Sequence, residues 1–190
     1  MSAGAGQWSR TPPPPGLPDT AALELLVTDG AVRAVAMLTA AEASELPGND
    51  DPLIDAVRML ATPAGAAYVP EAARLAGFAE GELRRLVLAY RHGGAGGAAA
   101  TLGPAECGDA ELEAAAAEVT RQRVLAIGDL TVSPGTITDP GAGVRIRLGP
   151  DSRWHPFTLA RQEWWPAAGA AESAGTAYQA ALRARSLRRA

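Results

Sequence analysis

The segment at residues 70–97 constrains the fold of this chain most strongly, because it predicts two helices joined by a glycine. Pro70 suits the first position of a helix, where its missing N–H needs no partner. Gly77 tolerates a positive φ and therefore turns easily between two helices. In the second helix the apolar residues recur at helical spacing and predict one buried stripe, formed by Leu83, Leu86, Val87 and Tyr90. The glycine pair at 93–94 predicts the end of this helix, followed by a glycine- and alanine-rich loop over residues 93–103.

The two helices at residues 70–92 resemble the helix-turn-helix of transposase-like bacterial proteins. The similarity is carried by the small-residue helix and glycine at 72–78, and by the helix that ends in tyrosine, arginine and two glycines at 83–94. Such a motif implies that the first turn of the second helix approaches base edges in DNA. Here that turn holds Glu80 and Glu82, whose charge is unfavourable beside phosphates. DNA binding is therefore the alternative hypothesis, with six candidate contacts: Arg84, Arg85, Arg91, Arg145, Arg147 and Arg153.

The composition favours a core of closely packed helices. Hydrophobic residues make up 47% of the 190 residues, but Phe, Trp and Tyr account for only 5%, so large anchors are few. All 17 basic side chains are arginine, which is typical of a GC-rich genome. The net charge of −4 argues against a dedicated nucleic-acid-binding protein. Residues 140–190 nevertheless hold more arginines than acids, so contact with a polyanion would be local.

Few residues are arranged for catalysis or metal binding. Cys107 is the single cysteine, which excludes an intrachain disulfide and a cysteine-based zinc cluster. His92 and His155 are the two histidines, and neither has metal ligands at workable spacing. The glycine-rich run after His92 lacks the lysine and hydroxyl residue of a phosphate-binding loop. Because the chain has no apolar run of 18 residues and no secretory signal, we expect a protein of the bacterial cytosol without membrane contact. Because no catalytic or metal-binding arrangement is recognisable, we also expect no enzymatic activity, no cofactor and no metal.

The expected fold class is α+β. Asp51 and Asp109 are placed to cap helices that begin at Pro52 and Ala110. We expect a helical bundle that contains the helix-turn-helix-like pair, then a small antiparallel meander, then a C-terminal helix. The predicted parts are a flexible proline-rich arm at 1–18, the helical domain at 19–122, the β-sheet module at 123–169 and a basic C-terminal helix at 170–190.

The β-type stretches begin near Arg123 and are separated by Pro-Gly and glycine-rich turns, which predicts three or four antiparallel strands. Apolar residues at 144, 146 and 148 alternate with Arg145 and Arg147. This alternation predicts a half-buried strand with a basic outer face.

The C-terminal half resembles the tail of bacterial SWIM-type zinc-finger proteins. Three segments carry the similarity: the strand ending in RLG at 147–149, the RWHPF segment at 153–157 and the WWPAAG segment at 164–169. The preceding helical region is also similar, so the resemblance covers most of residues 17–169. The SWIM element needs C-x-C followed by C-x-H, which a chain with one cysteine lacks, so zinc binding is not implied. The resemblance implies an accessory region that acts beside separate partner proteins.

Four aromatic residues lie close together in this half: Trp154, Phe157, Trp164 and Trp165. We expect them mainly in the core of the sheet, and any that are exposed are natural anchors for a protein partner. The favoured function is therefore an adaptor that acts through protein–protein contacts. Binding to DNA would be distinguished from adaptor function by an affinity for duplex DNA that falls steeply as the salt concentration rises.

Overall fold

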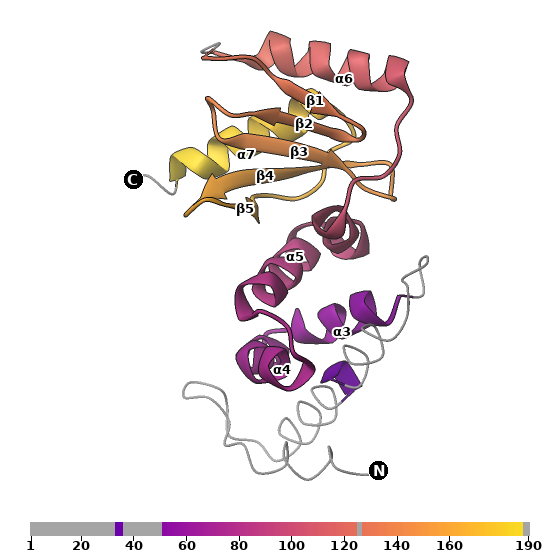
Figure 1. The fold of residues 1–190 in the computed structure, drawn as a ribbon, viewed down its shortest axis with the longest axis vertical. Helices are drawn as coiled ribbons and strands as arrows, with labels where there is room; N and C mark the ends of the chain where they lie inside the picture. Colours follow the sequence, from indigo (N-terminus) through magenta and orange to yellow (C-terminus); the bar gives the residue numbers. More distant parts are fainter. Residues whose placement is uncertain (1–32, 36–50, 125–126, 188–190) are drawn as a thin grey trace. The chain divides into compact units, whose positions relative to one another are not determined.

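The computed structural model describes residues 33–35, 51–124 and 127–187. It has an α+β fold, in which N-terminal helices precede a five-stranded antiparallel meander and a C-terminal helix packs on the sheet (Figure 1). The fold class predicted from the sequence is thereby confirmed. The predicted arm at 1–18 lies outside the described residues. Among the residues that are described, no helix is long and apolar enough to cross a membrane.

The chain divides into two compact units, residues 1–87 and residues 88–190. The described part of the first unit is helical, and residues 33–35 also belong to a helix. Its elements are α3 (Pro52–Leu60), the 3₁₀ helix η1 (Gly65–Tyr68), α4 (Val69–Ala76) and the start of α5 (Glu80–Leu102). The buried side chains of this unit are mostly aliphatic and include Leu53, Val57, Leu60, Ala72, Leu83 and Leu86, and the aromatic ring of Tyr68 is buried with them.

The signals for helix ends in the first unit are confirmed. The carboxylate of Asp51 accepts a hydrogen bond of 2.8 Å from the backbone N–H of Leu53 and caps α3. Pro70 lies in the first turn of α4, and Gly77 ends this helix with a φ of 78°. The two helices predicted at 70–92 are therefore present, with a left-handed glycine between them.

The prediction of a loop over residues 93–103 is wrong. Helix α5 does break at the glycine pair, where Gly94 has a φ of 60° and a ψ of −152°, but it then resumes and continues to Leu102. The glycine pair therefore ends one helical segment, as predicted, but a second segment follows it within α5 in place of the expected loop. Alanine is the strongest helix former, which accounts for the return to helix over the alanine-rich residues 98–100.

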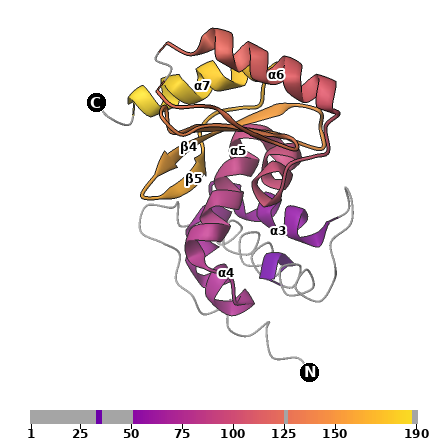
Figure 2. The same ribbon diagram turned by 45° about the horizontal axis from the view of Figure 1, so that its top comes forward.

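The second unit contains the rest of α5, then α6 (Asp109–Gln122) and a sheet. The strands pair only with their neighbours in sequence, in the order β1 (Thr131–Ser133), β2 (Thr136–Asp139), β3 (Val144–Leu148), β4 (Trp154–Ala160) and β5 (Glu163–Pro166). Helix α7 (Ala174–Leu187) follows, and it lies with α6 over one face of the sheet (Figure 2). The core between helices and sheet contains Val119, Ile137, Val144, Ile146, Trp154 and Tyr178.

Several details of this unit differ from the sequence predictions. There are five strands instead of three or four, because residues 163–166 form a fifth, and the first strand is short, covering Thr131–Ser133. Gly108 is the N-cap of α6 and makes no side-chain bond, so Asp109 lies in the first turn and does not cap the helix. Helix α7 begins at Ala174, later than predicted, where the hydroxyl of Ser173 accepts a hydrogen bond from the N–H of Thr176.

Candidate functional site

Strand β3 separates apolar from basic side chains, as its alternation predicted. Val144, Ile146 and Leu148 are buried in the core against α7. Arg145 and Arg147 lie on the opposite face, but they are only half exposed. Burial lowers the pKa of both guanidinium groups, and the neighbouring charge of Arg147 lowers that of Arg145 further. The predicted half-buried strand with a basic outer face is confirmed, and both arginine side chains of that face also pack against other parts of the unit.

Arg147 connects the sheet to the end of α5. Its Nη1 atom donates to the carbonyl oxygens of Ala100 and Thr101, at 3.2 and 3.1 Å. Carbonyls in the last turn of a helix lack partners within the helix, and a cation there is favourable. The guanidinium also lies 5.7 Å from the ring centroid of Phe157. These contacts indicate a structural role for Arg147.

Arg145 packs at the other end of the same face. Its guanidinium carbon lies 4.2 Å from the ring centroid of Trp164, which is a cation–π contact, and its Nε donates to the hydroxyl of Thr138 at 3.0 Å. Leu159 pairs with Trp164 across strands β4 and β5, so both side chains lie on this face. Leu159 is 41% exposed and Trp164 is partly exposed. We call Arg145, Leu159 and Trp164 the hairpin patch.

The four aromatic residues of the cluster differ in burial. Trp154 and Phe157 are both buried, on opposite faces of β4. Trp164 and Trp165 are each half-buried and lie on opposite faces of β5. The prediction that these aromatics mainly form the core is therefore confirmed for Trp154 and Phe157.

The turn between β4 and β5 has an unusual backbone. Arg161 and Gln162 have φ values of 51° and 68°, and they connect the last strand pair, Ala160 with Glu163. Positive φ at both central positions defines the tight hairpin turn that glycine, asparagine and aspartate usually occupy. This left-handed conformation costs conformational energy at residues such as Arg161 and Gln162. Backbone strain of this kind is found more often at functional sites. The hairpin that carries Leu159 and Trp164 is thus closed by a tight two-residue turn.

The arginines proposed for DNA contact are engaged in interactions within the chain. Arg84 is exposed and pairs with Glu80 at 2.6 Å within the first turns of α5. Arg85 and Arg91 lie on the same helix, and each makes contacts within the protein. Arg153 donates to the carbonyl oxygen of Ala170 at 3.2 Å. With Arg145 and Arg147 engaged on the sheet, each of the six has an interaction inside the chain.

The kink of α5 lies against a histidine and an aspartate of the sheet region. His155 is buried, and its Nε2 atom lies 3.0 and 3.1 Å from the two carboxylate oxygens of Asp151. A β-carbon at Gly96 would lie 2.1 Å from Asp151 Oδ2, and one at Gly93 would lie 2.7 Å from His155 Nδ1. The glycine-rich run after His92 therefore allows the helix backbone to approach these two side chains.

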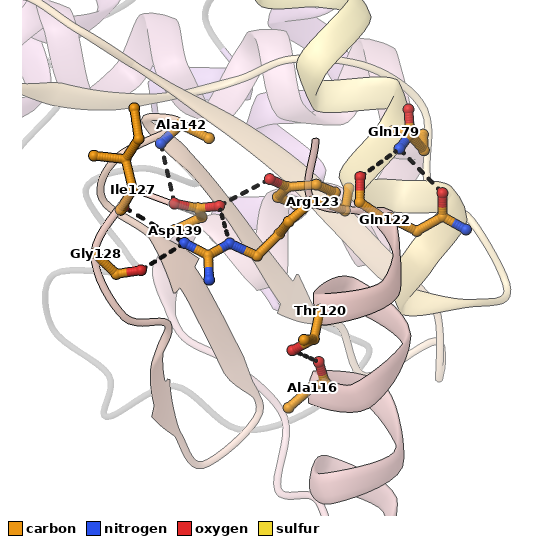
Figure 3. A network of polar contacts seen from close by, with 10 residues as sticks. Ala116, Thr120, Gln122, Arg123, Ile127, Gly128, Asp139, Ala142 and Gln179 are labelled. Atoms are coloured by element: carbon orange, nitrogen blue, oxygen red, sulfur yellow. Dashed lines mark hydrogen bonds and ion pairs between the residues drawn. The ribbon is translucent and has the colours of Figure 1, made fainter. Parts of the chain in front are cut away.

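A buried polar network lies on the other side of the sheet, and sequence reasoning missed it. Arg123 Nε lies 2.9 Å from Asp139 Oδ2, and both side chains are buried (Figure 3). Asp139 also accepts from the phenol of Tyr178 at 2.8 Å and from the N–H of Ala142 at 3.0 Å. Burial and the hydrogen bond to Asp139 raise the pKa of Tyr178 well above its usual range. Asp139 precedes a Pro-Gly pair, and its sequence neighbours indicate only a turn. Its partners Arg123 and Tyr178 lie far away in the sequence, so no local signal identifies them.

Two further observations concern chemistry at the described residues. Burial and nearby acidic groups raise the pKa of the Cys107 thiol, which disfavours the reactive thiolate. Across residues 33–35, 51–124 and 127–187, no three His, Cys, Asp or Glu side chains are grouped to hold a metal ion.

No family model matches this chain, and no curated protein or solved structure is significantly similar to it. The resemblance to the tail of SWIM-type proteins and to a transposase-like helix-turn-helix stays a prediction carried by sequence pattern.

Proposed function

We propose that this chain is a non-catalytic accessory protein of the bacterial cytosol that binds a protein partner through the hairpin patch. The observation that carries the proposal is the arrangement of Arg145, Leu159 and Trp164. An arginine stacked on a partly exposed tryptophan combines two residue types that dominate binding energy at protein interfaces, and the exposed leucine beside them adds apolar surface that a partner can cover.

Rigidity supports the same proposal. Trp164 and Leu159 lie on paired strands, and Arg145 is fixed by its bond to Thr138, so little side-chain entropy is lost when a partner binds. The left-handed turn at 161–162 fixes the end of the hairpin. A pre-organised patch of this kind suits an adaptor.

DNA binding is the alternative proposal. Its support is the helix-turn-helix-like pair, in which α4 and α5 flank the left-handed Gly77. Against it stand the two glutamates in the first turn of α5 and the internal contacts of all six candidate arginines. These contacts reduce the charge that is ready to meet phosphates, and we therefore favour the adaptor.

The test is capture of partners from the native cell with three forms of the tagged full-length protein. We expect the wild type to retain a specific protein that Leu159→Asp and Trp164→Ala lose. Val132→Asp is the matched control, since Val132 is 44% exposed on β1 and lies outside the hairpin patch. Equal capture by all forms contradicts the role of the patch.

Fluorescence anisotropy with duplex DNA distinguishes the alternative. We expect no binding that weakens steeply between 50 and 200 mM salt. Tight, strongly salt-dependent binding that Arg84→Gln reduces would favour the DNA-binding function instead.

A further inference from the structure

The sheet face opposite α6 and α7 carries the basic side chains of β3 (Figure 2). Strand pairing places Thr138, Arg145 and Phe157 in one row across β2, β3 and β4 on this face. Alternate residues of a strand share a face, so Arg147 lies on it too. The hairpin patch is therefore one end of a basic sheet face, and α5 contacts the other end through Arg147.

The two guanidinium groups of this face have neutral partners. Arg145 donates to the hydroxyl of Thr138, and Arg147 donates to carbonyl oxygens of α5. Within the described part of the chain, no carboxylate pairs with either arginine. Glu163, the acid next to Trp164 in sequence, lies on the opposite face of β5. The described residues therefore leave the positive charge of this face without a counter-charge.

Arg145 is the cation that a binding partner can reach. It is half exposed, and among the described residues only its Nε has a hydrogen-bond partner, which leaves the N–H groups of Nη1 and Nη2 available. Burial lowers the pKa of Arg145, and the charge of Arg147 lowers it further, because both disfavour an unpaired cation. A carboxylate beside Arg145 would offset the repulsion between the two guanidinium groups.

Arg147 contributes to this face through its charge. Its Nε atom is buried and has no hydrogen-bond partner in the described part of the chain. The bonds from Nη1 to α5 hold the side chain in place, so it cannot turn outward to meet a ligand without losing them. Its field still acts on an anion bound at Arg145, because charges interact strongly over a few ångströms in a partly buried site.

Apolar surface adjoins the available cation. Leu159 is exposed, and Trp164 is half-buried with the guanidinium of Arg145 against its ring. The ring and the bond to Thr138 together fix the plane of the guanidinium. A guanidinium held in this way presents parallel N–H groups that match the two oxygens of a carboxylate.

We propose that the hairpin patch binds an acidic segment of its protein partner, in which a glutamate or aspartate side chain pairs with Arg145 and a neighbouring apolar side chain covers Leu159 and Trp164. This inference rests on the proposed function of the patch and adds the chemistry of the partner. Charge complementarity and the adjoining apolar surface both favour such a segment.

Two features favour a protein over a nucleic acid. Leu159 would find no apolar complement on a phosphate backbone. Nucleic-acid binding draws on several phosphate contacts, whereas the bonds of Arg147 to α5 leave Arg145 as the arginine of β3 that can make one.

The first experiment selects random-sequence peptides displayed on phage with the full-length protein, after depletion on the Trp164→Ala variant. We expect the selected peptides to carry an acidic residue beside an apolar one. Replacing that acid by its amide should weaken binding to the wild type about tenfold, as measured by fluorescence anisotropy. Peptides that need Trp164 but bind equally well as amides overturn this inference alone. No enrichment over Trp164→Ala contradicts the proposed function of the patch as well.

Substitution of the arginine completes a double-mutant cycle. With Arg145→Met, the acid and amide peptides should differ by less than about twofold. Arg183→Met is the matched control and should keep the tenfold difference, because Arg183 is exposed on α7, which covers the opposite face of the sheet. Circular dichroism melting verifies that each variant is folded, and the peptide substitution tests the acid without any change to the protein.

Two outcomes of this cycle overturn the proposal. A full preference for the acid in Arg145→Met would show that another group reads the carboxylate. Binding of a labelled single-stranded oligonucleotide that both Arg145→Met and Trp164→Ala abolish would assign the patch to nucleic acid instead.

Discussion

Tyr178 donates a hydrogen bond of 2.8 Å to Asp139, which joins helix α7 to the end of strand β2. The same carboxylate oxygen pairs with Arg123, so one buried aspartate holds a helix, a strand and the chain after α6. We derive predictions for this network, for the kink of α5, and for Arg147, which donates to the carbonyl oxygens at the end of α5.

Asp139→Asn should destabilise the second unit by about 3 kcal/mol, because it leaves the Arg123 cation buried without its counter-charge. Urea unfolding followed by tryptophan fluorescence measures this, since Trp154, Trp164 and Trp165 lie in β4 and β5. Asp129→Asn, at an exposed position, is the matched control and should change stability by less than about 0.5 kcal/mol. Equal effects of the two substitutions would show that the network is not stabilising.

Stability should fall as the pH rises above about 10, the ordinary pKa of tyrosine. The pKa of Tyr178 is raised in the folded state, so the folded protein retains a proton that the unfolded chain releases in this range. The raised pKa of Tyr178 therefore stabilises the folded state fully below pH 10, and this stabilisation is lost as the pH rises further. The chain contains no lysine, which leaves few other groups to titrate there.

Tyr178→Phe tests this alkaline effect. The variant should be less stable at pH 8, but its stability should fall less than that of the wild type between pH 10 and 12. Both forms should carry Cys107→Ser, because the pKa of that thiol is also raised and its ionisation would overlap. Parallel stability curves for the two proteins would rule out Tyr178 as the source.

Gly96→Ala should destabilise the protein by about 1–3 kcal/mol, since the new methyl group would overlap the Asp151 carboxylate. Gly81→Ala is the matched control in the same helix, where a β-carbon meets nothing within 4 Å. That substitution should stabilise by roughly 0.5–1 kcal/mol, because alanine favours helix. Thermal melting of both variants gives the comparison, and a stabilising Gly96→Ala contradicts the close approach at the kink.

Arg147→Met should cost about 1–2 kcal/mol, because the carbonyl oxygens of Ala100 and Thr101 lose their donor while the apolar stem is kept. Arg153→Met removes one exposed bond to Ala170 and should have a smaller effect. Hydrogen exchange of the amides at the end of α5 should increase in the first variant only. Unchanged exchange there would show that Arg147 does not stabilise the helix end.

Much of the fold was predictable because its signals are local. The cap at Asp51, the left-handed Gly77 and the alternation of β3 each depend on a few neighbouring residues, and each was predicted correctly. The return of α5 to helix after Gly94 was not predicted, since the glycine pair is a strong stop signal. The approach to Asp151 and His155 that accompanies the kink involves residues far along the chain.

The candidate sites depend even more on distant contacts. The alternation of β3 predicted which face Arg145 and Arg147 occupy, but the partners of Arg147 lie 46 and 47 residues away in sequence. Asp139 meets Arg123 across 16 residues and Tyr178 across 39. The clustering of the aromatics predicted that they would mainly form a core, but only the paired strands show which are enclosed: Phe157 in the longer strand β4 is buried, whereas Trp164 on the same face of β5 is half-buried.

The meander has a consequence for how this unit is made. Each strand pairs only with the strand before and after it, so every hairpin closes over a short stretch of chain. Short closures favour rapid assembly, because little chain entropy is lost before the pairing forms. The sheet can therefore grow strand by strand as the polypeptide leaves the ribosome, and α7, which follows the strands in the chain, then completes the core by covering one face.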